Sequence, residues 1–116
     1  MKLLEIKEIL NAEIFAGEEL LEKEIHSACG SDLMSDVLAF VKDQALLLTG
    51  LVNGQVVRTA EMMDIKAIVF VRGKKPTEEV ITLAKEFGIA IMSTEGAMYA
   101  SCGKLYSAGL GVNEVE

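Results

Sequence analysis

Apolar and polar residues follow two different periods along this chain. Runs that are apolar at almost every position occupy 44–49, 66–71 and 89–93. Between them, residues 53–64 and 76–88 have the three- and four-residue apolar spacing of amphipathic helices. A strand without polar alternation is buried on both faces, which is typical of a parallel sheet covered by helices. The pattern therefore predicts an α/β fold, with a small, mainly parallel sheet flanked by helices on both faces.

The remaining segments are expected to complete the sheet and its helical cover. Residues 2–10 and 95–110 have the spacing of amphipathic helices. Residues 12–16 and 24–29 have the length and composition of short strands, and we expect both at one edge of the sheet. Right-handed crossovers should then connect the parallel strands.

A further helix is expected after the strand over 24–29. Ser31 or Asp32 is its candidate N-cap, and it should end at about Val41. Its inner face should carry Leu33, Val37 and Phe40.

Candidate capping residues predict where the two crossover helices begin and where the second one ends. Asn53 is expected to cap the helix over 53–64, Thr77 should cap the helix that follows it, and Gly88 should end that second helix. The inward-facing residues of the first helix are expected to be Val56, Val57, Ala60 and Met63.

Composition and charge restrict the class of protein. A chain of 116 residues fits a single domain, residues 1–116, and at 51% hydrophobic it can bury a core. Its net charge of −7 argues against nucleic acid or an anionic membrane as a partner. No apolar run approaches the roughly 18–20 residues of a membrane span, and "MKLLEIKEIL" is typical of an amphipathic helix rather than a signal peptide. Cys29 and Cys102 form no CxxC motif, so a reducing, cytoplasmic location is expected.

Loops that follow parallel strands meet at one edge of the sheet, where ligands bind. Four such loops are expected, after the strands over 24–29, 44–49, 66–71 and 89–93. Each leads into a helix N-terminus, which favours an anion, and three of the eleven Lys and Arg residues lie within 72–75. The candidate ligand-binding residues are Thr49, Gly50, Asn53, Arg72, Gly73, Lys74, Ser93 and Thr94. The alternative is that the glycines only turn corners, the polar residues cap helices, and the basic loop is solvated surface.

The sequence offers few other residues that could bind a metal or take part in catalysis. His26 and Cys29 offer two metal ligands, whereas a closed zinc site needs four, so no metal site is predicted. The motifs GxGxxG, GxxxxGK[ST], HExxH and GxSxG do not occur. General acid–base and nucleophilic catalysis need positioned partners, which one histidine and scattered cysteines do not supply. We therefore expect neither catalytic activity nor a cofactor.

Two long segments carry a family resemblance: "EIFAGEELLEKEIHSACGSDLMSDVLAFV" and "ALLLTGLVNGQVVRTAEMMDIKAIVFVRGKKPTEEVITLAKEFGIAIMSTEGAMYASCGKLY". Together they resemble the DRTGG domain over about residues 8–110. The phrase "AGEELLEKEI" is also similar to the opening of the HPr kinase N-terminal domain, which has a related fold. The family's Asp-Arg pair aligns with "GLVNGQ", where it is missing, and its Thr-Gly-Gly triplet aligns with "VRGKK", where only Gly73 is kept.

The resemblance implies a regulatory or dimer-forming module without catalysis, since DRTGG domains play that part in CBS-domain pyrophosphatases and in phosphotransacetylase-like chains. Two hypotheses follow. In the first, a small anionic ligand such as an adenine nucleotide binds at the loops after the parallel strands. In the second, the chain is an accessory protein–protein interaction or dimerisation module without a small-molecule ligand. A homodimer is expected in either case, and the last helix, with Met98, Tyr99 and Leu105, is a candidate face.

Overall fold

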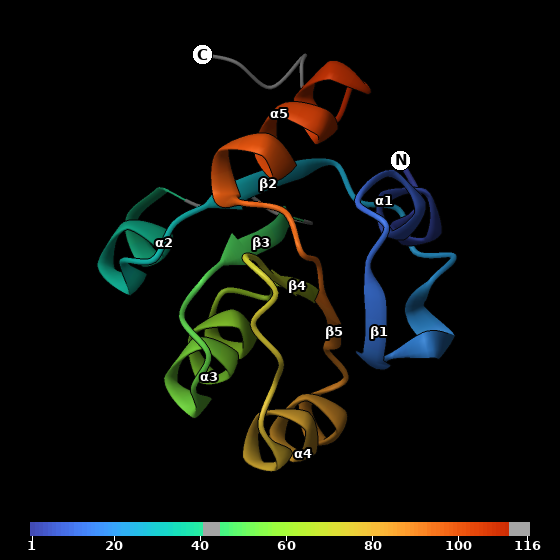
Figure 1. The fold of residues 1–116 in the computed structure, drawn as a ribbon. Helices are drawn as coiled ribbons and strands as arrows, with labels where there is room; N and C mark the ends of the chain where they lie inside the picture. The colour runs from blue at the N-terminus through green and yellow to red at the C-terminus, as the bar shows by residue number, and fades with distance from the viewer. Residues whose placement is uncertain (41–44, 112–116) are drawn as a thin grey trace.

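The structure, a computed structural model, describes residues 1–40 and 45–111, without the side chain of Phe40. A five-stranded sheet forms its centre, in the order β1-β5-β4-β3-β2 (Figure 1). Its strands are β1 (Glu13–Ala16), β2 (Ser27–Gly30), β3 (Ala45–Thr49), β4 (Ala67–Phe70) and β5 (Ala90–Ser93). Its helices are α1 (Leu3–Ile9), the 3-10 turn η1 (Glu18–Leu20), α2 (Met34–Phe40), α3 (Gly54–Met62), α4 (Glu78–Phe87) and α5 (Met98–Ser107).

The parallel core predicted from the apolar runs is confirmed. Strands β2, β3, β4 and β5 pair in parallel with their neighbours in that order. Successive residues of a strand point to opposite faces. Accordingly, Leu46 and Leu48 of β3 join one hydrophobic cluster and Leu47 joins the other. Because both faces are covered, the strands need no polar alternation.

The expectation that the two short strands share one edge is wrong. Strand β1 lies at one edge and pairs antiparallel with β5, whereas β2 lies at the opposite edge beside β3. The connection between β1 and β2 runs along α1, where Leu3 N–H bonds to Lys23 O and Ile25 N–H bonds to Met1 O. These backbone bonds direct the chain toward the far edge of the sheet. The apolar pattern of a short strand does not predict which strand it pairs with.

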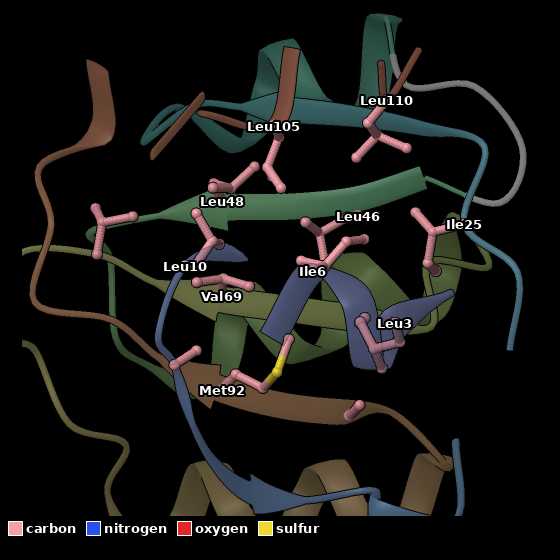
Figure 2. Close-up of a cluster of buried hydrophobic side chains, with 14 residues drawn as sticks. Leu3, Ile6, Leu10, Ile25, Leu46, Leu48, Val69, Met92, Leu105 and Leu110 are labelled. Carbon is pink, nitrogen blue, oxygen red and sulfur yellow. The ribbon is translucent and has the colours of Figure 1, made fainter. Parts of the chain in front are cut away.

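The sheet is covered by two separate helix layers. Helices α1 and α5 lie on one face, and α3 and α4 lie on the other (Figure 1). Figure 2 shows the α1 and α5 side, where Ile6 and Leu105 converge on Leu46, Leu48 and Val69. No helix in the described part of the chain is long and apolar enough to cross a membrane.

The predicted caps of the crossover helices are confirmed. The Asn53 side chain accepts from Val56 N–H at 3.1 Å, and Thr77 Oγ1 accepts from Val80 N–H at 3.2 Å. Gly88 ends α4 in the left-handed conformation, with φ +72°. The predicted inner face of α3 is buried at Val56, Val57 and Ala60, while Met63 is half-buried at the C-cap.

The expectations for α2 are met only in part. Val37 is fully buried as expected, but Leu33 precedes the helix and its side chain is 58% exposed. The expected positions of the Phe40 side chain and of Val41 lie outside the described residues. Ser31 Oγ accepts from Leu33 N–H at 3.0 Å and so closes a local turn before the helix. Asp32 reaches across to the loop after β3 instead of capping α2.

Candidate functional site

The loops after β3, β4 and β5 are joined at the carboxyl edge of the sheet. Backbone bonds connect Val71 N–H to Thr49 O at 3.0 Å, Arg72 N–H to Gly96 O at 2.7 Å, and Gly73 N–H to Thr94 O at 2.8 Å. The structure thus brings these loops together, as a parallel sheet requires.

A carboxylate lies at the centre of this edge. Asp32 Oδ1 accepts from Gly50 N–H at 2.7 Å and from Thr49 Oγ1 at 3.0 Å. Asp32 Oδ2 lies 3.5 Å from Arg72 Nη2. The hydrogen bond from Gly50 N–H, followed by the Thr49 hydroxyl and the Arg72 charge, lowers the pKa of Asp32 below its usual value. We call the three donors, Gly50 N–H, Thr49 O–H and the Arg72 guanidinium, the anion cradle.

The backbone around the cradle is unusual. Arg72 adopts a left-handed conformation with φ +60°, which is uncommon for a residue other than glycine. A Cβ at position 50 would meet the Arg72 guanidinium, so a glycine there lets the arginine lie over the loop. Non-glycine residues in this region cost about 1–3 kcal/mol and concentrate at functional sites.

Several of the predicted site hydroxyls are used within the protein. Ser93 Oγ donates to Lys74 O at 2.6 Å, and Thr94 Oγ1 donates to Leu10 O at 2.7 Å. Both side chains are buried, and the Asn53 side chain is occupied as the cap of α3. Among the predicted site residues, the charged side chains that remain accessible are those of Arg72 and Lys74.

The positive charge of the 72–75 loop is partly neutralised by acids that the sequence pattern did not place there. Lys75 Nζ lies 3.4 Å from Glu13 Oε1 and 3.8 Å from Glu95 Oε2. Lys74 forms no ion pair with residues 1–40 or 45–111. The sequence signal for Asp32 at this site is its position directly after β2, although the same position before α2 also favours a helix cap.

The residues considered as metal ligands or reactive thiols do not form a cluster. No group of three His, Cys, Asp or Glu side chains in the described ranges is placed to hold a metal ion. His26 is exposed, and Cys29 and Cys102 are half-buried. Burial raises the pKa of both thiols, which disfavours the reactive thiolate.

A concave surface lies away from the anion cradle, at the opposite edge of the sheet from β1. It is a groove of ≈ 1120 Å³ between β2 and α5, lined mainly by apolar atoms. At its base, a Cβ on Gly30 would lie 2.7 Å from Cys102 Sγ, so glycine permits α5 to pack closely on the strand.

The comparison with family models decides the family. The model of the DRTGG domain matches residues 5–108. The chain belongs to the DRTGG domain family. No curated protein matches the sequence. Among solved structures, the DRTGG domain is similar to the CBS and DRTGG domains of the regulatory region of Clostridium perfringens pyrophosphatase, complexed with the activator diadenosine tetraphosphate. The identity is 16% and the TM-score is 0.71; the match covers 90% of this chain and 45% of that chain, and it shows a shared fold.

The anion cradle joins the loops after β3 and β4. In the sequence, these are the loops in which the Asp-Arg pair and the Thr-Gly-Gly triplet of the family are expected. These are the two loops that Arg72 and Asp32 bridge, with Arg72 on one and Asp32 bonded to the other. The DRTGG domain of this chain therefore has an acid–arginine contact at that edge.

Proposed function

We propose that this DRTGG domain is a non-catalytic regulatory module that binds a small anionic ligand, such as an adenine nucleotide, at the carboxyl edge of its sheet. The observation that carries the proposal is the convergence of Gly50 N–H, Thr49 O–H and the Arg72 guanidinium on one carboxylate. Donors of these kinds bind carboxylate and phosphate oxygens.

Two further features support an anionic ligand at this edge. The side chain of Arg72 is 46% exposed, and Lys74 beside it is exposed, so both cations can reach a molecule at the surface. The similar pyrophosphatase regulatory region contains both CBS and DRTGG domains and was solved with a nucleotide activator, so a DRTGG domain occurs in a region that a nucleotide regulates. We place the protein in the cytoplasm, where its two thiols would stay reduced.

The non-catalytic part of the proposal agrees with the electrostatics of Asp32. Like an ordinary aspartate, Asp32 is ionised near neutral pH, and its hydrogen bonds lower its pKa further, so it is a poor general acid there. Its role in the proposal is to accept hydrogen bonds, not to transfer protons.

A thermal-shift screen with nucleotides and phosphorylated metabolites tests the proposal. A ligand at 100 times its Kd should stabilise the fold by about 2.7 kcal/mol. The double variant Arg72→Ala/Lys74→Ala should lose most of the shift. The matched control Lys66→Ala/Lys85→Ala removes the same charge near the opposite end of the sheet and should keep the shift. Equal responses of the two double variants would refute the site, and no response of the wild type to any anion would refute the ligand.

A second candidate function is supported by the outer edge of β2, which no other strand within residues 1–40 and 45–111 covers. Ser31 N–H bonds to Leu48 O, so by alternation Ala28 and Gly30 direct their backbone groups away from β3. The exposed side chains of Tyr99 and Tyr106 line the groove beside this strand. An open edge strand is a template for pairing with another chain. We therefore propose that the protein is a homodimer joined at β2, and that in this alternative the domain acts by protein–protein contact alone.

Fewer residues of α5 are available for a dimer contact than the sequence predicts. Leu105 is buried in the core and cannot serve the dimer, whereas Tyr99 is 91% exposed and remains a candidate contact.

A further inference from the structure

The anion cradle is filled by the chain itself. Every donor of the cradle is directed at Asp32, whose carboxylate is the chemical equivalent of a small carboxylate or phosphate ligand. We propose that Asp32 is an internal competitor that occupies the anion position, so that an external anion binds by displacing it. This inference rests on the proposed function, because it concerns the same donors.

The position of Asp32 suits a displaceable group. Its side chain is 52% exposed, and its contact with Arg72 is long, at 3.5 Å. By contrast, Thr49 is the last residue of β3, Gly50 follows it directly, and both are buried. The Asp32 side chain can therefore rotate into solvent without disturbing the core.

Displacement leaves strong donors that a ligand must satisfy. A buried N–H or O–H without an acceptor is costly, so the vacated cradle favours any anion that reaches it. Such an anion would also neutralise Arg72, which loses its carboxylate partner when Asp32 leaves. The bonds from the cradle to Asp32 are exchanged for equivalent bonds to the external anion. The equilibrium between the two states therefore depends on the concentration of that anion.

The competition predicts both a weakened affinity and a structural response. When the binding-competent state is only a fraction of the population, the apparent Kd is the intrinsic Kd divided by that fraction. Asp32 also lies in the short connection between β2 and α2, which begins at Met34. Release of Asp32 removes its bonds to Thr49 and Gly50 from this connection. We therefore expect ligand binding to change the conformation at the start of α2.

The test compares two carboxylate variants with inorganic phosphate and acetate as separate probes, by NMR or calorimetric titration. Asp32→Ala removes the competitor. Glu95→Gln is the matched control, because Glu95 lies against Gly73 at the same edge but does not contact the cradle donors. We expect Asp32→Ala to bind a probe at least about tenfold tighter than the wild type, as release of a competitor predicts, and Glu95→Gln to bind like the wild type.

The outcomes separate this inference from the proposed function. Equal or weaker binding by Asp32→Ala, or an equal gain in Glu95→Gln, overturns the competition. In that case, wild-type binding that Arg72→Ala/Lys74→Ala abolishes leaves the proposed function standing. Binding by Asp32→Ala but not by the wild type supports the competition and shows that the wild type is closed at that concentration. No binding by either protein overturns both.

A second variant covers a failure of Asp32→Ala to fold. Asp32→Asn keeps an oxygen for Gly50 and Thr49 but loses the charge that meets Arg72. A neutral amide competes less well than a carboxylate for these donors, so this variant should also bind the probe more tightly than the wild type. The absence of any gain would again overturn the competition.

Discussion

The hydroxyl of Thr94 donates a 2.7 Å hydrogen bond to the carbonyl oxygen of Leu10, across 84 residues of sequence. This buried bond joins the end of β5 to the end of α1. Thr94→Val should destabilise the fold by about 1–3 kcal/mol, because it leaves the Leu10 carbonyl without its donor. Urea unfolding measures the change. Thr94→Ser keeps the hydroxyl and should lose less, and a Thr94→Val variant as stable as Thr94→Ser would disprove the role of the bond.

The stability that Asp32 contributes should depend on pH in a defined direction. Its folded-state pKa is lowered, chiefly by the Gly50 N–H, and Arg72 is the charged group that contacts it. A lowered carboxylate pKa stabilises the folded state above the unfolded pKa, near 4, and this contribution is lost as the pH falls through the lower folded value. The stability difference between the wild type and Asp32→Asn should therefore be constant between about pH 5 and 8 and shrink below about pH 4.

Urea unfolding of both proteins at several pH values gives this difference directly. A difference that stays unchanged down to about pH 2, or that grows on acidification, is incompatible with an ionised, hydrogen-bonded Asp32.

The contact between Gly30 and α5 should appear as coupling between two positions. Gly30→Ala places a methyl group 2.7 Å from Cys102 Sγ and 3.1 Å from Met98 Sδ, so one side must shift. Overpacking of this kind costs about 1–3 kcal/mol. In a Cys102→Ala background the cost should be smaller, because the sulfur is gone. Additive effects of the two substitutions in a double-mutant cycle would show that α5 does not pack against β2 at this point.

The proposed dimer at β2 can be disrupted without touching the core. Ala28 is exposed on β2, the edge strand of the described sheet, and a lysine there blocks strand pairing. Light scattering at tens of micromolar should report a dimer for the wild type and a monomer for Ala28→Lys. Met62→Lys, at an exposed position of α3 on the far helix layer, is the control and should stay dimeric. A wild-type monomer, or a dimeric Ala28→Lys, rejects this interface.

The sequence predicts the centre of the fold better than its margins. The apolar runs of β3, β4 and β5 identify a parallel core because only a strand covered on both faces lacks polar positions. The edge positions of β1 and β2 depend instead on backbone bonds between α1 and residues 21–25, which leave no periodic signal. A short strand has the same apolar pattern whether it pairs parallel or antiparallel, and whichever edge of the sheet it occupies.

The candidate site shows a similar limit. The pattern correctly places Gly50, Arg72 and Gly73 in loops that the structure joins. It could not show that the Thr94 hydroxyl is bonded to a residue far away in sequence, because that depends on tertiary contact. Nor could it separate a capping aspartate from one that crosses to a neighbouring loop, since Asp32 suits both roles in sequence.

The most direct test of an anion site at this edge is an NMR titration of the wild-type protein with ATP, following backbone amides. We predict that the largest shifts occur at Gly50, Arg72 and Gly73, with a smaller response at the start of α2. Amides of the groove between β2 and α5, such as Ala28 and Gly103, should change little. Shifts confined to that groove, or no shifts at millimolar ATP, would contradict the proposal that this edge of the sheet binds an anionic ligand.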